Sequence, residues 1–319
     1  MGQICRHQFR WIIFSFLVVI FSHNLSFAES NAGFAGSFLR MGLGARSLAL
    51  GNTGVAAPVN AYSAFYNPAA LAEMDGRLFG SSYSFLSLDR SFSFVSLSIK
   101  IPPQAGASVG WIRTSVGDLK SYNSSGLQTG DINQSANAIY FSFGRPILYN
   151  LHIGVSIKIL FESINDGTDA FDYSSNGVGF DFGLLYRYTE NLSFGYLIRD
   201  INSKLKANTD KLFEFGGTTI DEFPLIHKLG VYYLTDFHGI RAIYEFERSD
   251  KGDTRHHVGF ETVHGENLAL RLGFNDGQVV FGGGIDFTVL NTVSYLDYAF
   301  LPSVVDEGSS HVFSWQFVF

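Results

Sequence analysis

The sequence predicts an all-β protein, a transmembrane antiparallel β-barrel of about 14 strands with an N-terminal hatch or plug inside the lumen. Three observations lead to this prediction. Apolar and polar residues alternate over segments of about ten residues, connections of two lengths alternate along the chain, and the final strand is aromatic on one face. Strands of soluble proteins average about 5–6 residues, whereas membrane-spanning strands need about 9–11.

The N-terminal residues predict export. Arg6 and Arg10 form a basic region, residues 11–20 an apolar run, and residues 26–28 (SFA) a cleavage site. The apolar run is too short for a spanning helix, which needs roughly 20 residues, but it suits a secretory signal peptide. We therefore expect residues 1–28 to be a cleaved signal peptide and Glu29 to begin the mature chain.

Composition and charge exclude several classes of function. The only cysteine, Cys5, lies in the expected signal peptide, so the mature chain has neither a disulfide nor a cysteine nucleophile. The net charge of −7 becomes about −9 without Arg6 and Arg10, and no long basic run remains, so nucleic acid is not an expected partner. No mature apolar stretch reaches helical spanning length. Such a chain either stays soluble or crosses a membrane as a closed barrel.

Residues 29–78 differ from the rest of the mature chain because they do not alternate. Small residues dominate there, and the glycines allow tight turns and close backbone approach. Asn67 and Pro68 are expected to begin a turn or a helix, since Asn can cap and Pro fixes its own φ. A compact segment of about 50 residues has the size to plug a barrel. We therefore expect a hatch over residues 29–78 and a transmembrane barrel over residues 79–319.

The barrel strands follow from the alternation. In residues 151–161 every odd-numbered residue is apolar, and most even-numbered ones are polar or small. A soluble sandwich would also show this pattern, so strand length and the connections decide between the two folds. We expect strands at residues 79–88, 91–101, 105–115, 134–145, 150–163, 177–188, 191–199, 225–235, 238–248, 254–264, 267–276, 279–288, 291–301 and 309–319.

The connections between these strands differ in length at the two ends of the expected barrel. At the end that carries the N-terminus they are short, at residues 102–104, 146–149, 189–190, 236–237, 265–266 and 289–290. The longest connections, residues 116–133, 164–176 and 200–224, all fall at the opposite end, as do residues 249–253 and 302–308. Short periplasmic turns and longer outer loops are typical of outer-membrane barrels. A soluble sandwich is not expected to alternate short and long connections in this way.

The final nine residues form the most informative single strand. Phe313, Trp315, Phe317 and Phe319 share one face, because side chains alternate with period two, and the other face is polar at positions 314 and 316. This pattern resembles the closing strand of bacterial outer-membrane barrels. The resemblance implies a Gram-negative outer membrane, contact with its lipids, and an assembly signal that the barrel assembly machinery reads. The alternative is an amphipathic edge strand of a soluble sandwich.

The faces opposite the apolar ones carry charges of both signs. We expect these residues to point into the lumen as an ion-paired network that stiffens the barrel around its plug. They form no ring of a single sign that would indicate ion selectivity. The expected lumen residues are Lys158, Glu162, Asp181, Arg187, Arg199, Arg241, Glu245, Glu247, Glu261, Arg271, Asp286 and Asp297.

We expect neither an enzyme nor a metal or cofactor site. The sequence contains no G-x-S-x-G elbow, and the pair His256 and His257 lacks the H-E-x-x-H spacing of zinc proteases. Asp166, Asp169 and Asp172 miss the spacing of an EF-hand calcium loop, and a solvated acidic loop is the simpler interpretation.

The N-terminal segment carries a family resemblance. Residues 42–54 read GLGARSLALGNTG, and residues 64–71 read AFYNPAAL. Both runs resemble the hatch of the FadL-like outer-membrane superfamily, and within it the chain is most similar to the PorV/PorQ family. This resemblance implies a fourteen-stranded barrel with an inserted hatch, and it places the N-P-A motif of the hatch at Asn67, Pro68 and Ala69.

The resemblance leaves two functions open. Members of the superfamily include transporters of fatty acids and aromatic hydrocarbons, which implies a plugged conduit for small hydrophobic molecules. A ligand would meet Phe34, Phe38, Phe65 and Tyr66 of the hatch, although plain packing of plug against wall explains the same aromatics. PorV-like members act instead in type IX secretion, where they bind secretion-system proteins as cargo carriers or attachment factors. A purely structural surface protein is a third interpretation.

Overall fold

The computed structural model describes residues 33–166, 172–210, 216–265, 267–289, 292–303 and 308–319. The expected signal peptide and its cleavage site lie outside these residues, as does Asp169. Within the described part of the chain, no helix is long and apolar enough to cross a bilayer.

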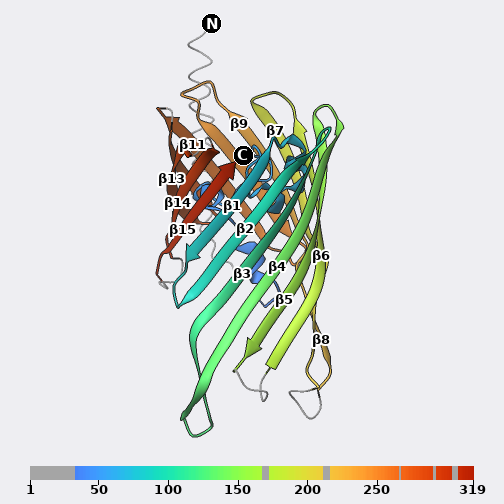
Figure 1. Cartoon of the computed structure of the whole chain (residues 1–319), viewed down its shortest axis with the longest axis vertical. Coiled ribbons are helices and arrows are strands. Elements are labelled where there is room, and N and C mark those ends of the chain that lie inside the picture. The colour runs from blue at the N-terminus through green and yellow to red at the C-terminus, as the bar shows by residue number, and fades with distance from the viewer. Residues whose placement is uncertain (1–32, 167–171, 211–215, 266, 290–291, 304–307) are drawn as a thin grey trace.

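The described residues form 15 strands of one antiparallel sheet that closes on itself (Figure 1). Fourteen of them make the wall, as the sequence predicts, and the short β8 pairs only with the far end of β7. The bounds are β1 (Arg77–Phe85), β2 (Arg90–Ile101), β3 (Ala105–Tyr122), β4 (Gln128–Leu148), β5 (Leu151–Asn165), β6 (Asp172–Arg187), β7 (Leu192–Asn208), β8 (Thr218–Glu222), β9 (Ile226–Leu234), β10 (Arg241–Ser249), β11 (Thr254–His264), β12 (Leu268–Asn275), β13 (Gln278–Val289), β14 (Thr292–Leu301) and β15 (Ser310–Val318).

The wall closes between the first and the last strand. β1 pairs with β15 in a continuous register from Leu78 opposite Val318 to Phe85 opposite His311. One step beyond, Arg77 N donates to Phe319 O at 2.8 Å and Phe319 N donates to Arg77 O at 3.0 Å. Closure leaves no sheet edge, which a membrane-spanning sheet requires because lipid offers the backbone no hydrogen-bond partners.

The outer face of the wall is apolar. On β5 the side chains of Val155, Ile157 and Ile159 are exposed, whereas the residues between them are buried inside. The terminal strand follows the same rule, since Phe313, Trp315 and Phe319 are exposed and Ser314 is buried. The predicted aromatic face of β15 therefore points outward, toward lipid. A continuous exposed apolar belt of this kind suits a membrane and not water.

The predicted long outer loops are wrong in one respect, because most of their residues continue the strands. β3 and β4 stay paired as far as Tyr122 opposite Gln128, and β7 runs on to Asn208, where β8 pairs with it. On β3 and β4 the extension carries no buried apolar face, so its sequence does not show the alternation of a membrane strand. On β7 the buried Leu205 and Ala207 do alternate with polar residues, but they follow the irregularity at Asp200, which interrupts the pattern. The backbone groups of these extensions are nevertheless satisfied by strand pairing.

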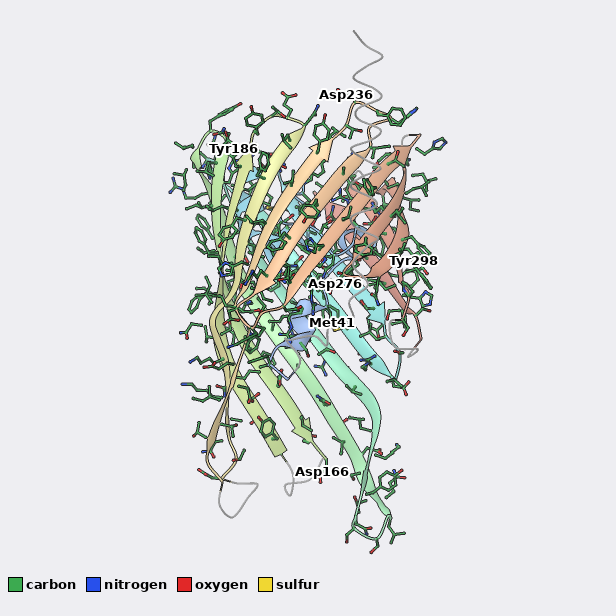
Figure 2. All side chains as sticks on the ribbon, turned by 180° about the vertical axis from the view of Figure 1, so that it is seen from behind. Met41, Asp166, Tyr186, Asp236, Asp276 and Tyr298 are labelled. Carbon is green, nitrogen blue, oxygen red and sulfur yellow. The ribbon has the colours of Figure 1, made fainter. Side chains whose placement is uncertain are left out.

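These extensions make one side of the barrel taller than the other. β3 to β8 continue well past the ends of β9 to β15 (Figure 1). In Figure 2, Asp276, at the turn between β12 and β13, lies near the level of Met41, whereas Asp166, at the end of β5, lies far beyond it. Tyr186 and Asp236 mark the opposite rim, where the connections are short as predicted.

The described part of the N-terminal segment, residues 33–76, lies inside the ring of strands (Figure 1). It contains α2 (Ser37–Arg40), α3 (Ala45–Ala49), α4 (Ser63–Tyr66) and the 3₁₀ helix η1 (Pro68–Glu73). α3 packs on β12 to β15, and η1 packs on β3 to β6, so the segment reaches opposite sides of the wall. These helices are too short to be stable alone, and they depend on this packing.

The closing pair predicts that Phe319 matters for assembly. Replacing Phe319 with Asp puts a charge on the outer apolar face, beside the last hydrogen bonds between β1 and β15, and we expect a marked loss of folded barrel in membranes. The matched control is Leu127→Asp, an exposed apolar residue in the turn between β3 and β4. Heat-modifiable gel mobility of membrane fractions measures the outcome, and equal insertion of both variants would contradict the prediction.

Candidate functional site

The N-terminal segment touches the inner wall mainly at glycines. A Cβ atom at any of these positions would overlap the segment or press against it, so the missing side chain makes room for it. Several of them pair across neighbouring strands, as Gly106, Gly144, Gly154 and Gly183 do on β3 to β6. The wall glycines that face the segment are Gly80, Gly106, Gly144, Gly154, Gly183, Gly195, Gly230, Gly259, Gly273 and Gly282.

Asn67, Pro68 and Ala69 form the tightest of these contacts. Asn67 caps η1, because its side-chain oxygen accepts a hydrogen bond from Ala69 N at 3.0 Å and Pro68 occupies the first helical position. The Asn67 amide nitrogen donates to Val55 O at 2.7 Å and to Leu184 O at 2.9 Å. This one side chain therefore joins two parts of the segment to β6, and the predicted helix start at Asn67 and Pro68 is confirmed.

The glycine-rich turn before Val55 binds a carboxylate of the wall. Gly54 N and Val55 N both donate to Oε1 of Glu245 at 2.6 Å, and Glu245 is fully buried. Successive backbone N–H groups in a tight turn make a concave anion site, here filled by a side chain of β10. The G-N-T-G sequence thus serves to hold the segment against the wall.

A second charged contact fixes α3. Arg46 makes a two-pronged pair with Glu261, from Nε to Oε1 at 2.9 Å and from Nη2 to Oε2 at 2.8 Å. Glu261 also accepts from Arg241 and Arg271 at 2.8 Å, and Arg271 donates to Asp297 at 2.7 Å. The predicted ion-paired network in the lumen is therefore present on β10, β11, β12 and β14, and it includes the segment.

A third contact lies where η1 ends. Glu73 accepts from Arg187 through both carboxylate oxygens, one at 2.5 Å from Nε, and lies 3.3 Å from His152 Nε2. Burial alone would raise the Glu73 pKa, but the hydrogen bonds from Arg187 and His152 outweigh it and lower the pKa to about 2. Glu73 is therefore ionised at neutral pH and ties the segment to β5 and β6.

The lumen beside the segment has an apolar sector that sequence reasoning missed. Phe92, Phe94, Ile112 and Tyr140 point inward from β2, β3 and β4 and are almost fully buried. Phe94 stacks on Tyr140 with ring centroids 6.1 Å apart, and it lies 5.5 Å from Tyr62 of the segment. This sector is lined mostly by aromatic side chains, whereas the lumen residues predicted on the strands are all charged.

The sequence contained a signal for this sector. On β2 the apolar residues shift from even positions, Phe92 and Phe94, to odd positions, Val95, Leu97 and Ile99, without any break in the pairing. Such a change of phase means that apolar side chains face inward in one half of the strand and outward in the other. The apolar side chains of the first half therefore face the segment, and those of the second half face lipid.

The next sector of the wall, on β5 to β7, is charged. Lys158 Nζ pairs with Asp181 at 2.7 Å and with Asp200. Asp200 follows Arg199 directly, yet both side chains are buried inside, because β7 contains two register irregularities and Asp200 has a φ of 63°. A bulge re-aims side chains in this way. Arg199 then reaches the segment, donating from Nη2 to Phe65 O at 2.8 Å.

The four aromatics predicted to meet a ligand lie in different surroundings. Phe38 and Phe65 belong to the apolar cluster with Phe223 and the inner wall. Phe34 is half-buried below the ammonium of Lys251, 5.0 Å from the ring centroid. The Tyr66 hydroxyl is bonded to Leu43 and Asn52 within the segment. Tyr66 also belongs to this cluster through its ring, so Phe38, Phe65 and Tyr66 are the predicted residues in contact with the apolar sector, and Phe34 is not among them.

Catalytic and metal-binding arrangements were not expected. Among the described residues, no three His, Cys, Asp or Glu side chains are grouped so that they could hold a metal ion. Nδ1 of His257 lies 2.9 Å from Gly51 O, and its Nε2 lies 3.5 Å from Glu247. It contributes to holding the segment.

No protein-family model matches this chain, and no curated protein sequence does. Solved structures with a similar fold include the toluene transporter TbuX of Ralstonia pickettii (TM-score 0.62, 14% identity, covering 87% of this chain and 98% of that one). The toluene transporter TodX of Pseudomonas putida is similar at a TM-score of 0.60 and 15% identity, covering 87% and 96%.

A FadL homologue of Pseudomonas aeruginosa is similar at a TM-score of 0.60 and 11% identity, covering 86% of this chain and 97% of that one. The chain therefore shares the barrel fold of FadL-like channels, as the resemblance implied.

The close contact between Gly154 and Pro68 predicts that one added methyl group lowers the stability of the protein. In Gly154→Ala the new Cβ would overlap the Pro68 carbonyl, and we expect a destabilisation of about 1–3 kcal/mol. Gly217→Ala is the matched control, because a Cβ there meets nothing and the effect should stay within about 0.5 kcal/mol. Thermal unfolding in detergent measures both, and equal stability of the two variants would show that the segment does not press on the wall.

The Glu73 contact predicts a pH-dependent stabilisation. The pKa falls from its usual 4.5 to about 2 on folding, so the stabilisation is complete above about pH 4.5 and lost as the pH falls to about 2. Relative to Glu73→Gln, the natural protein should be more stable by about 2–3 kcal/mol at pH 7 and equally stable near pH 2.

Melting temperatures of both proteins across this pH range test the prediction. Asp75→Asn is the control, because Asp75 pairs with Lys100 in a largely exposed position and exposed pairs contribute little. A difference between natural protein and Glu73→Gln that persists unchanged at pH 2 would refute the role of ionised Glu73.

Proposed function

We propose that this protein is a plugged outer-membrane conduit through which small hydrophobic molecules pass passively. The observation that carries the proposal is the apolar, aromatic sector of the lumen, which lies directly against Phe38 and Phe65 of the N-terminal segment. A barrel that only needed a stiff wall could fill this space with paired polar groups, as it does on β10 to β14. The similarity between the fold of this protein and that of the toluene transporters TbuX and TodX also supports small hydrophobic molecules as the cargo.

The proposal includes the cellular setting inferred from the sequence. Residues 1–28 direct export, residues 29–78 form the hatch, and residues 79–319 form the barrel in a Gram-negative outer membrane. The aromatic face of β15, which contacts lipid, also serves as the signal for the barrel assembly machinery. The exposed apolar belt of the wall and the shared fold of the channels support this setting.

Passage follows the apolar edge of the segment, with the segment itself in place. Backbone N–H groups of the segment donate to Glu245 on β10 and to Ser314 on β15. The side chains of Arg46 and Asn67 bond the segment to Glu261 on β11 and to Leu184 O on β6. Releasing all these buried contacts together would leave several charged groups unpaired, which costs several kcal/mol. Along β2 to β4, by contrast, mostly apolar side chains meet, and these can change rotamer without unpairing a charge.

The alternative role in type IX secretion rests on the resemblance of the segment to the PorV/PorQ family. None of the structures named above is described as a secretion component. The apolar sector is enclosed within the lumen, where a protein partner has no access. We therefore place the conduit first, and co-purification with large outer-membrane proteins would favour secretion.

Uptake by intact cells tests the conduit. Cells of a Gram-negative host that produce the protein should take up labelled toluene faster than cells without it. A charge in the apolar path should slow this uptake, so Phe38→Asp is expected to reduce the rate about tenfold at equal barrel content. Met41→Asp is the matched control, because Met41 ends the same helix but is exposed.

Native mass spectrometry of the purified barrel provides an independent measurement, since a conduit of this kind should retain a lipid or hydrocarbon. An empty lumen, together with toluene uptake equal to that of cells without the protein, would refute the proposed conduit.

A further inference from the structure

Tyrosine–histidine pairs repeat one geometry on the outer face of the described strands. They are Tyr196 with His227 on β7 and β9, Tyr244 with His256 on β10 and β11, and Tyr298 with His311 on β14 and β15. In each pair the tyrosine lies opposite the residue two positions after the histidine, so the rings meet diagonally across the strands. The ring centroids are 6.1 Å apart in every pair, and the hydroxyl lies 2.8 or 2.9 Å from Nδ1. A geometry that recurs in this way indicates a common requirement at this place on the wall.

The paired rings lie on the outside of the barrel near its outer rim. His227, His256 and His311 are the second, third and second residues of β9, β11 and β15, which all begin at that rim. The next residue along each strand is buried in the lumen, so the histidines point outward. Figure 2 shows Tyr298 near the level of Asp276, which lies at the same rim. The pairs therefore lie where the exposed apolar belt ends, at the level of the lipid headgroups.

Each pair keeps one hydrogen to donate outward. If the tyrosine hydroxyl donates to Nδ1, the neutral imidazole carries its proton on Nε2, and if Nδ1 donates, the hydroxyl keeps its own hydrogen. Nε2 of His311 lies 3.5 Å from the Ser309 hydroxyl, whereas Nε2 of His227 and of His256 has no partner among the described residues. The stacked tyrosines hold both imidazoles in place, which lowers the ordering cost of binding.

A guanidinium lies between the pairs of β7 to β11. Arg248 of β10 is directly opposite His227 in the register, on the same outward face, and it is exposed. It makes no ion pair within the described part of the chain. The carboxylates of the next turn pair with other cations, Asp250 with Lys251 and Asp253 with Arg255. This face therefore combines one positive charge with two further hydrogen-bond donors, and its charge complements a phosphate group.

The surface next to these donors is apolar and faces lipid. Phe194, Leu229 and Phe260 are exposed on the outer faces of β7, β9 and β11, two or four residues from the paired rings. A free phosphate ion would use the donors alone. A molecule that joins phosphate groups to acyl chains meets the donors and the apolar surface together, so the observations favour a lipid.

We propose that Tyr196, His227, Tyr244, Arg248 and His256 form a binding site for the phosphate groups of lipid A, the anionic glycolipid of Gram-negative outer leaflets. Neighbouring strands lie about 4.8 Å apart, so β9 to β11 bring Arg248 between the two imidazoles, within the span of one headgroup. Arg248 forms charge-assisted hydrogen bonds with a phosphate, and the imidazole pairs donate to its other oxygens. The inference rests on the outer-membrane setting proposed above and not on the passage of a cargo.

Binding to the purified full barrel in detergent, measured by native mass spectrometry, tests the site. The probes are lipid A with two phosphates and the same lipid without phosphate. The natural protein should bind the phosphorylated lipid about tenfold more tightly, and Arg248→Gln should lose this preference because the charged partner is gone. Inorganic phosphate at millimolar concentration should not compete, and competition by it would show an ion site instead and overturn the lipid assignment.

Two further variants keep the test decisive. Arg145→Gln is the matched control, because Arg145 is an exposed arginine of β4 near the opposite rim, and it should change the affinity by less than about twofold. The double variant His227→Phe and His256→Phe keeps both rings, removes their donors and should weaken binding of the phosphorylated lipid about tenfold. Heat-modifiable gel mobility shows that each variant is folded. An unchanged phosphate preference in Arg248→Gln, or an equal loss in Arg145→Gln, would overturn the inference.

Toluene uptake separates this inference from the proposed function. Arg248→Gln should leave toluene uptake unchanged, since Arg248 lies outside the lumen. If the natural protein takes up no toluene but binds lipid A through its phosphates, the conduit is refuted and the lipid site stands. If uptake is seen and the phosphates make no difference to binding, the lipid site alone is refuted.

Discussion

The structure depends on one steric constraint, the direct contact between the backbone of the N-terminal segment and the inner surface of the barrel. Carbonyl groups of Leu50, Val55 and Pro68 lie where a Cβ atom of the wall would otherwise stand. A ring of glycines on the strands permits this contact. Because interiors are packed at close to crystal density, a segment seated this tightly has one position, and the rest of the lumen is arranged around it.

Seating the segment so deeply creates a demand for hydrogen bonds. Backbone groups removed from water need partners, and the wall supplies Glu245 for a turn, Ser314 for α3 and Ser193 for the carbonyl of Ala56. Charged pairs on opposite sides, Arg46 with Glu261 and Glu73 with Arg187, hold the segment at α3 and at the end of η1. The polar residues of the lumen are thus structural, and the proposed conduit rests on the remaining apolar sector.

Apolar and charged side chains meet where the apolar sector on β2 to β4 borders the charged sector on β5 to β7. The bulged β7 turns Arg199 and Asp200 to the same side, and this places a balanced set of charges next to the aromatic side chains of β2 and β4. The bulge of β7 and the change of phase within β2 therefore shape the interior more than the loops outside do.

Local patterns in the sequence were enough to predict the barrel, its fourteen-stranded wall, the outward face of β15, the compact segment before β1 and the capping of η1 by Asn67. These features follow from period-two alternation and from short-range backbone preferences, which act between residues close in the chain. The paired extension of β3 and β4 escaped prediction because it has no buried apolar face, and that of β7 because the irregularity at Asp200 interrupts the alternation.

The partners of the segment lie far away in sequence, as Arg46 and Glu261 or Ala45 and Ser314 do. Which glycines meet the segment, and which aromatics turn inward beside Tyr140, depends on strand register and bulges around the closed wall. Register is set by the packing of all fourteen strands at once, so these contacts arise only when the barrel closes around the segment.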